Sequence, residues 1–156
     1  MIDIQYGSHM AFFPAKVASA NGTYGHVYNI VLSANTDNGV LAGRGAYSSF
    51  DNYAQAAAPT GFAGKIIDKA ANGNWYVEVT ALGEGETLVL YNAAVSEYAE
   101  RDLQKESLFY NKSGDVVQGM PLIVGDILEL SKEAFTGATV LNKAVSFAAG
   151  KYAVAS

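Results

Sequence analysis

Acid–base and nucleophilic chemistry would have to rely on very few side chains in this sequence. The chain of 156 residues has no cysteine and two histidines, which excludes thiolate nucleophiles, disulfides and thiolate zinc sites. His26 lies between Gly25 and Val27, with no carboxylate or nucleophile at a spacing typical of a triad. The fold could still supply partners, but a structural or surface histidine is the expected role.

Two groups of carboxylates are candidates for paired acid chemistry. Glu84 and Glu86 are two residues apart in a glycine-rich turn, and Glu97, Glu100 and Asp102 cluster in a predicted loop. A glycosidase needs two carboxyl groups about 5–10 Å apart in a cleft, usually beside aromatic rings. Ten Tyr, seven Phe and one Trp could supply such rings. Solvated acids on loops are nevertheless the expected role, and we predict that the chain is not an enzyme.

The sequence predicts neither a metal nor a cofactor site. Asp37 lies in the oxygen-rich turn 35–39, but this turn lacks the regular acid spacing and the closing Glu of an EF-hand loop. The glycine pairs at 43 and 45 and at 83 and 85 match neither a phosphate-binding loop nor a dinucleotide fingerprint. We therefore interpret these residues as turn and strand chemistry.

Two adjacent aromatic residues, Trp75 and Tyr76, are the candidate platform for stacking against a sugar. They open the predicted strand 75–81, in which residues alternate between the two faces of a sheet. This alternation predicts that one ring points toward the core and the other outward.

A second aromatic feature lies close to the N-terminus, where Phe12, Phe13 and Pro14 follow one another. Two phenylalanines left in water would be costly, since burying one contributes roughly 1.5–3 kcal/mol. Two interpretations remain open. The segment is either an arm that contacts a partner protein, or an ordinary first strand docked on the protein's own core.

The elements that position these residues are predicted to be strands. Short runs rich in aromatic and β-branched residues, separated by turn residues, predict about nine or ten strands and little helix. The runs are 24–32, 40–47, 62–68, 75–81, 87–91, 108–110, 115–119, 122–130, 144–148 and 151–155. Hairpins are expected to join 62–68 to 75–81, 108–110 to 115–119, and 144–148 to 151–155. The spacing predicts an all-β fold, either a compact sandwich or a partly open barrel.

The segments between these runs are expected to be mostly irregular. Residues 51–60 are predicted to form a loop or one short helical turn that stops before Pro59. The charged segment 93–105 has no convincing helical period and is predicted to be a loop with at most one helical turn. Ser131 is predicted to cap a single helical turn.

Composition narrows the range of partners. The net charge of −5 and a pI near 4.9 argue against nucleic-acid binding, which usually requires a basic patch. No apolar run approaches the roughly 18 residues of a membrane span, so no membrane partner is predicted. Charged residues make up only 16% of the chain and aromatic residues 12%. Such a surface can pack against itself or against another protein, although a large core in a small β domain would give the same composition.

The length predicts one domain. Gly7-Ser8-His9-Met10 is typical of sequence left by an expression vector, so residues 1–9 are expected to be added residues. Residues 10–156 are then a single β-rich domain, with 10–20 as the candidate N-terminal arm.

Six segments, taken in chain order, carry a family resemblance. They are Gly43-Arg44-Gly45-Ala46-Tyr47, Ser49-Phe50-Asp51-Asn52-Tyr53, Phe62-x-Gly64-Lys65-Ile66, Asn74-Trp75-Tyr76-Val77-Glu78-Val79, Phe109-Tyr110-Asn111-Lys112-x-Gly114-Asp115 and Val124-Gly125-Asp126-Ile127-Leu128-Glu129-Leu130-Ser131. Together they resemble the small head decoration proteins, also called auxiliary or cement proteins, of tailed bacteriophages. The likeness covers nearly all of 10–156 and lies in overall character rather than in one diagnostic motif.

The resemblance implies a non-enzymatic structural protein made in the host cytoplasm and bound to the outside of the phage capsid in the virion. Its partner would be the major capsid protein, and the homo-oligomer would often be a trimer. Some proteins of this kind pin capsomers with a terminal arm, which makes Phe12, Phe13 and Pro14 the candidate contacts. The alternative is a glycan-binding surface or fibre-like module that uses Trp75 and Tyr76.

Overall fold

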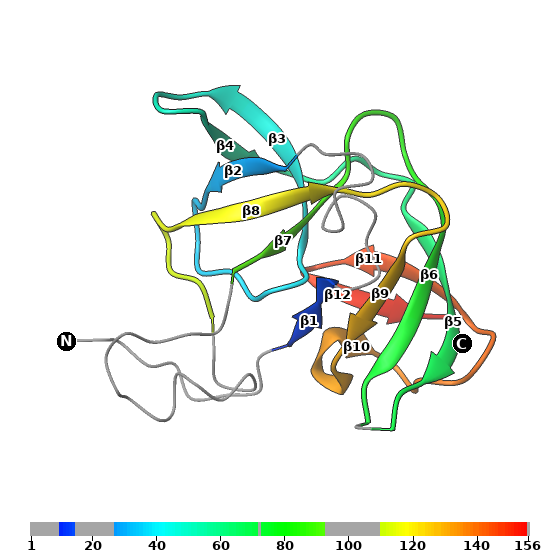
Figure 1. Ribbon diagram of the computed structural model, residues 1–156. Coiled ribbons are helices and arrows are strands. Elements are labelled where there is room, and N and C mark those ends of the chain that lie inside the picture. The colour runs from blue at the N-terminus through cyan, green and yellow to red at the C-terminus, as the bar shows by residue number, and fades with distance from the viewer. Residues whose placement is uncertain (1–9, 15–26, 72, 93–109, 156) are drawn as a thin grey trace, which may run out of the picture.

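The computed structural model describes residues 10–14, 27–71, 73–92 and 110–155 (Figure 1). Within these ranges nearly all regular structure is strand, which confirms the predicted all-β class with little helix. The strands are β1 (Phe12–Phe13), β2 (Tyr28–Val31), β3 (Leu41–Tyr47), β4 (Asn52–Ala56), β5 (Ala63–Lys69), β6 (Trp75–Ala81), β7 (Leu88–Tyr91), β8 (Val116–Pro121), β9 (Ile127–Leu130), β10 (Phe135–Thr136), β11 (Ala144–Ala148) and β12 (Lys151–Val154). Across the described ranges, no helix has the length and apolarity needed to cross a membrane.

Five strands close into a barrel in the order β2-β4-β3-β7-β8. The barrel closes because β8 pairs antiparallel with both β7 and β2. β2 and β4 run parallel, with Ile30 opposite Tyr53. The barrel interior holds a small core centred on the fully buried Ile30, Leu88 and Leu90.

The other seven strands form an open sheet in the order β1-β9-β6-β5-β11-β12-β10, which lies beside the barrel (Figure 1). Two of the predicted hairpins are confirmed here, because β5 pairs with β6 and β11 pairs with β12. The predicted alternation in β6 is also observed, since Val77 and Val79 are fully buried. These two residues belong to the larger core, which the sheet shares with the barrel residues Leu41 and Val89.

The prediction of a loop or helical turn over 51–60 was wrong, because this segment contains β4. Its sequence, Asn52 to Ala56, is alanine-rich and has no clear alternation of buried and exposed residues. The strand forms because it is paired on both edges, parallel to β2 and antiparallel to β3. Pairing from two neighbours outweighs the weak intrinsic strand propensity of the segment.

One further prediction fails at a turn. The strand predicted over 122–130 is interrupted at Ile123, whose amide donates a hydrogen bond to the Asp126 carboxylate at 3.0 Å, so only β9 remains extended. The hairpin predicted between 108–110 and 115–119 lies partly outside the described ranges, which leave out residues 108 and 109. Within those ranges β8 pairs with β2 and β7, and Asn111 forms a single bridge with Thr36.

Tyr152 lies at the centre of the larger core and is fully buried. Its hydroxyl donates a hydrogen bond to the Gly39 carbonyl at 2.7 Å, which ties β12 to the loop before β3. The rings of Phe62 and Phe147 meet it edge to face, with centroids 5.8 and 5.1 Å away. Burial raises the pKa of Tyr152 above the ordinary value of about 10.

Tyr152→Phe is therefore expected to change how stability depends on pH. The folded protein keeps the phenol proton at pH values where the unfolded chain releases it. The stability contributed by the neutral phenol is thus fully present below pH 10 and is lost above it, by about 1.4 kcal/mol per pH unit. The variant should be less stable by about 1–2 kcal/mol at pH 7, because the Gly39 carbonyl loses its donor.

Denaturant unfolding of both proteins between pH 7 and 11 measures this difference. The variant's free energy of unfolding should fall less steeply above pH 10, so that the two curves converge. Tyr47→Phe, at an exposed phenol, is the control. Parallel curves for the wild type and Tyr152→Phe would contradict the prediction.

Candidate functional site

The N-terminal aromatic segment is docked on the protein's own core. Phe12 is 2% exposed, pairs with Leu130 of β9, and meets the Tyr91 ring edge to face at 6.0 Å. Of the two interpretations of this segment, the structure shows the first strand rather than a free arm. Phe13 and Pro14 are half-buried and reach the surface, whereas Phe12 is not available there for a partner.

Hydrogen bonds on both sides hold this segment in place. The Met10 amide donates to the Asp37 carboxylate at 3.1 Å, and the Ala11 amide donates to Ser131 Oγ at 2.7 Å. The helical turn predicted after Ser131 exists as η2 (Lys132–Ala134), but the Ser131 side chain makes no capping bond to it. The Ser131 hydroxyl instead accepts the hydrogen bond from the Ala11 amide, next to β1, and the Asp37 carboxylate accepts the one from Met10.

Trp75 and Tyr76 lie on opposite faces of β6, as the alternation predicted. Trp75 packs against the larger core, and Lys69 Nζ lies 5.2 Å from its ring centroid. Tyr76 stands on the other face between Asp68 of β5 and Glu129 of β9, and partial burial together with Glu129 raises its pKa. The two rings therefore do not form one flat platform.

The carboxylate candidates are only partly within the described ranges. Glu84 is exposed, and Glu86 forms an ion pair with Arg44 at 3.0 Å. His26 and the cluster of Glu97, Glu100 and Asp102 lie outside those ranges. Among the residues that are described, no three His, Asp or Glu side chains gather closely enough to hold a metal ion.

An aromatic cluster that the sequence did not predict lies at one end of the barrel. We call it the aromatic barrel end; it consists of Tyr28 of β2, Arg44 and Tyr47 of β3, and Tyr53 of β4. The Tyr53 ring meets both other rings edge to face, with centroids 5.4 Å away in each case. The Arg44 guanidinium lies 4.4 Å from the Tyr28 ring centroid and 5.1 Å from that of Tyr53.

Glu86 neutralises the charge at this end of the barrel. Its carboxylate pairs with Arg44, and the two side chains are 35% (Arg44) and 40% (Glu86) exposed. Burial and the hydrogen bond to Glu86 raise the pKa of Tyr28, although Arg44 acts in the opposite direction. The surface thus presents neutral ring edges beside a matched ion pair.

The β3–β4 hairpin carries the most exposed aromatic ring in the described ranges, and in Figure 1 it extends beyond the other barrel strands. Phe50 at its tip is 89% exposed. Phe50 and Asp51 both have left-handed backbones, with φ of 60° and 59°, and the Asn52 amide closes the turn on the Ser49 carbonyl at 3.3 Å. Such a turn favours Asn-Gly, so a phenylalanine here is held outward at a conformational cost.

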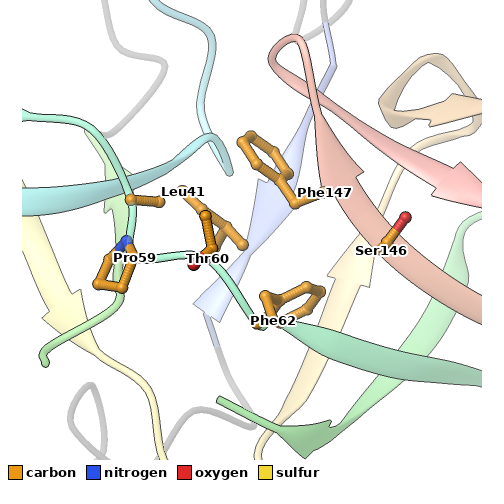
Figure 2. Close-up of a pocket in the computed structure, with 8 residues that line it drawn as sticks. Leu41, Pro59, Thr60, Phe62, Ser146 and Phe147 are labelled. Carbon is orange, nitrogen blue, oxygen red and sulfur yellow. The ribbon is translucent and has the colours of Figure 1, made fainter. Parts of the chain in front are cut away.

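A pocket of about 210 Å³ lies at the opposite end of this hairpin, between the β4–β5 connection and β11 (Figure 2). We call it the root pocket. It is lined by Leu41, Ala58, Pro59, Thr60, Gly61, Phe62, Ser146 and Phe147. No titratable side chain is among them, so the pocket offers apolar contact and two hydroxyl groups rather than acid–base chemistry.

The sequence predicts little of the aromatic barrel end, because its members come from three separate strands. Tyr28 and Tyr53 are neighbours only through the parallel pairing of β2 with β4. Because the sequence predicts a loop or a helical turn over 51–60, it does not predict that Tyr28 and Tyr53 are neighbours. The one available signal was Tyr47 and Tyr53 flanking a short polar turn.

Comparison of the chain with protein-family models, with curated proteins and with solved structures found no match.

Proposed function

We propose that the protein is a non-enzymatic structural protein that binds the outside of a tailed-bacteriophage capsid through the major capsid protein. The observation that supports a docking role is the aromatic barrel end, where Tyr47 is 61% exposed beside the Arg44–Glu86 pair. Protein interfaces concentrate tyrosine and arginine in this way, and these residues contribute most to binding. The capsid as partner comes from the resemblance to head decoration proteins.

The aromatic barrel end is also suited to docking because it is held in position before binding. The Tyr47 ring is fixed against Tyr53, and its hydroxyl accepts a hydrogen bond from the Asp51 amide at 3.4 Å. Tyr53 is fixed in turn by Tyr28 and Arg44. A side chain that is already ordered loses less conformational entropy when a partner covers it.

The described surfaces favour binding over catalysis. The root pocket is lined by apolar and hydroxyl side chains, and Glu86 is engaged by Arg44. A glycan-binding role has less support than capsid binding, because Trp75 and Tyr76 face opposite sides of β6 and do not combine into one platform.

Co-sedimentation with expanded, undecorated phage heads tests the proposal, with unexpanded proheads as the comparison. The wild type should bind expanded heads saturably. Tyr47→Ser should bind them about tenfold more weakly, since removing a central interface ring costs on the order of 1–2 kcal/mol. Bound protein should also raise the temperature at which the heads come apart, as a ligand of one state does.

Leu141→Ser is the matched control, because Leu141 is 49% exposed but lies between β10 and β11, two strands of the seven-stranded sheet and not of the barrel. It should bind like the wild type. Failure of the wild type to bind expanded heads would overturn the proposed function. Equal binding by Tyr47→Ser would remove the aromatic barrel end as the docking surface.

A further inference from the structure

We infer that copies of this chain associate by inserting the Phe50 tip of one copy into the root pocket of the next. This contact uses the hairpin tip, whereas capsid docking uses the adjoining aromatic barrel end, whose Tyr47 accepts a hydrogen bond from Asp51 of the tip. It gives the predicted homo-oligomer a specific interface, in which every copy has one inserting tip and one receiving pocket.

The tip has two features that are costly in an isolated chain. Phe50 is 89% exposed, whereas aromatic rings of this size are usually buried in a core or an interface. Phe50 and Asp51 are also both left-handed, at φ of 60° and 59°, although neither is glycine. A partner that buries the ring would account for both, because strained residues persist where function requires their geometry.

The root pocket matches this side chain in size and chemistry. Its volume of about 210 Å³ is below the roughly 300–1,000 Å³ of small-molecule sites and suits a single side chain. In Figure 2 the rings of Phe62 and Phe147 and the side chain of Leu41 surround the space. Because no charged group lines the pocket, an entering ring would leave no charge buried without a partner.

The tip cannot reach the pocket of its own chain. Leu41, which lines the pocket, is the first residue of β3, while Tyr47 is its last and Phe50 lies beyond it. Seven extended residues span about 20 Å, so the two features lie at opposite ends of one stiff hairpin. The only copy that can fill the pocket with this ring is therefore a second one.

The geometry also restricts the kind of assembly. A contact between two different surfaces is heterologous, so it repeats from copy to copy and ends only when a ring closes. A four-residue tip buries much less than the roughly 1,200–2,000 Å² of a stable interface, so one contact alone is weak. In a closed assembly, whether a reciprocal dimer or a small ring such as a trimer, each copy makes two such contacts, which favours closed assemblies over a pair joined by one contact.

Engineered cysteines test this contact directly, because the chain has no cysteine of its own. Ser49→Cys places a thiol at the exposed tip and keeps Phe50, while Thr60→Cys places one at the exposed rim of the pocket. The two single variants, one carrying a mass tag, are mixed under mild oxidation and run on a non-reducing gel. The mixed disulfide dimer should exceed either homodimer at least fivefold. The double variant should form a discrete covalent ring.

Two controls decide the outcome. Adding Phe50→Ser to the Ser49→Cys variant should reduce the mixed dimer at least fivefold, although the thiol is still present. Pairing Ser49→Cys with Val124→Cys, an exposed position elsewhere, should give only background cross-linking. Equal cross-linking to Thr60→Cys and Val124→Cys, or no dependence on Phe50, would overturn the inference. Neither result would alter the binding of the wild type to expanded heads.

Discussion

Phe12→Ala is expected to lower the free energy of unfolding by about 3–5 kcal/mol, the usual cost of removing a fully packed phenylalanine. The ring is 2% exposed and contacts Tyr91, and a Cβ built on Gly39 would lie only 2.8 Å from Phe12 Cβ. Backbone atoms and packed core side chains surround the Phe12 ring, so they cannot move in to fill the cavity that the substitution leaves. Denaturant unfolding followed by the fluorescence of Trp75 measures the loss.

Phe13→Ala is the matched control, since Phe13 is the next residue of β1 and is only half-buried. It should cost about 1 kcal/mol, near the centre of the range for single substitutions. Equal losses for the two variants would mean that β1 is not fixed on β9 in solution. The comparison also bears on capsid binding, because Phe13 and Pro14 reach the surface in the part of the predicted arm that the structure describes, residues 10–14.

Gly83→Ala is expected to cost about 3 kcal/mol or more, the upper end of what overpacking produces. A Cβ at Gly83 would overlap the Thr60 carbonyl oxygen and would lie 2.7 Å from the carbonyl carbon. Both atoms are backbone, so no side-chain rotation relieves the clash. The β4–β5 connection that forms one wall of the root pocket would have to move.

Gly73→Ala separates this clash from the general effect of losing a glycine. A Cβ at Gly73 would meet nothing within 4 Å, but its φ of 93° disfavours any L-residue. The expected cost is about 1–2 kcal/mol, from backbone conformation alone. Thermal unfolding of both variants should show the larger shift for Gly83→Ala, and the reverse order would contradict the close approach of Gly83 to Thr60.

The parts of the fold that sequence could predict are those specified by neighbouring residues. The β5–β6 hairpin follows from alternation around Val77 and Val79 and from a turn containing Asn-Gly, all within about twenty residues. The alternation also predicted that Trp75 and Tyr76 would face opposite sides. Local pattern and tertiary packing agree in this region.

The parts that could not be predicted depend on partners far along the chain. β4 has a weak sequence pattern of its own and forms because it pairs with β2 and β3. Since β4 could not be predicted, the contact between Tyr28 and Tyr53 could not be predicted either. Likewise, nothing near Phe12 distinguishes an arm from a strand. That choice is made by β9, where Ala11 and Ser131 meet across 120 residues of sequence.

The same long separation has a consequence for how the protein is made. A ribosome adds about 5–20 residues per second, so a separation of 120 residues corresponds to about 6–24 s of synthesis. During that interval Phe12 has been translated while its partner Leu130 has not, and β1 has no native strand to join. Closure of the seven-stranded sheet at that edge is therefore a late event, and the nascent chain carries an unpaired hydrophobic start until then.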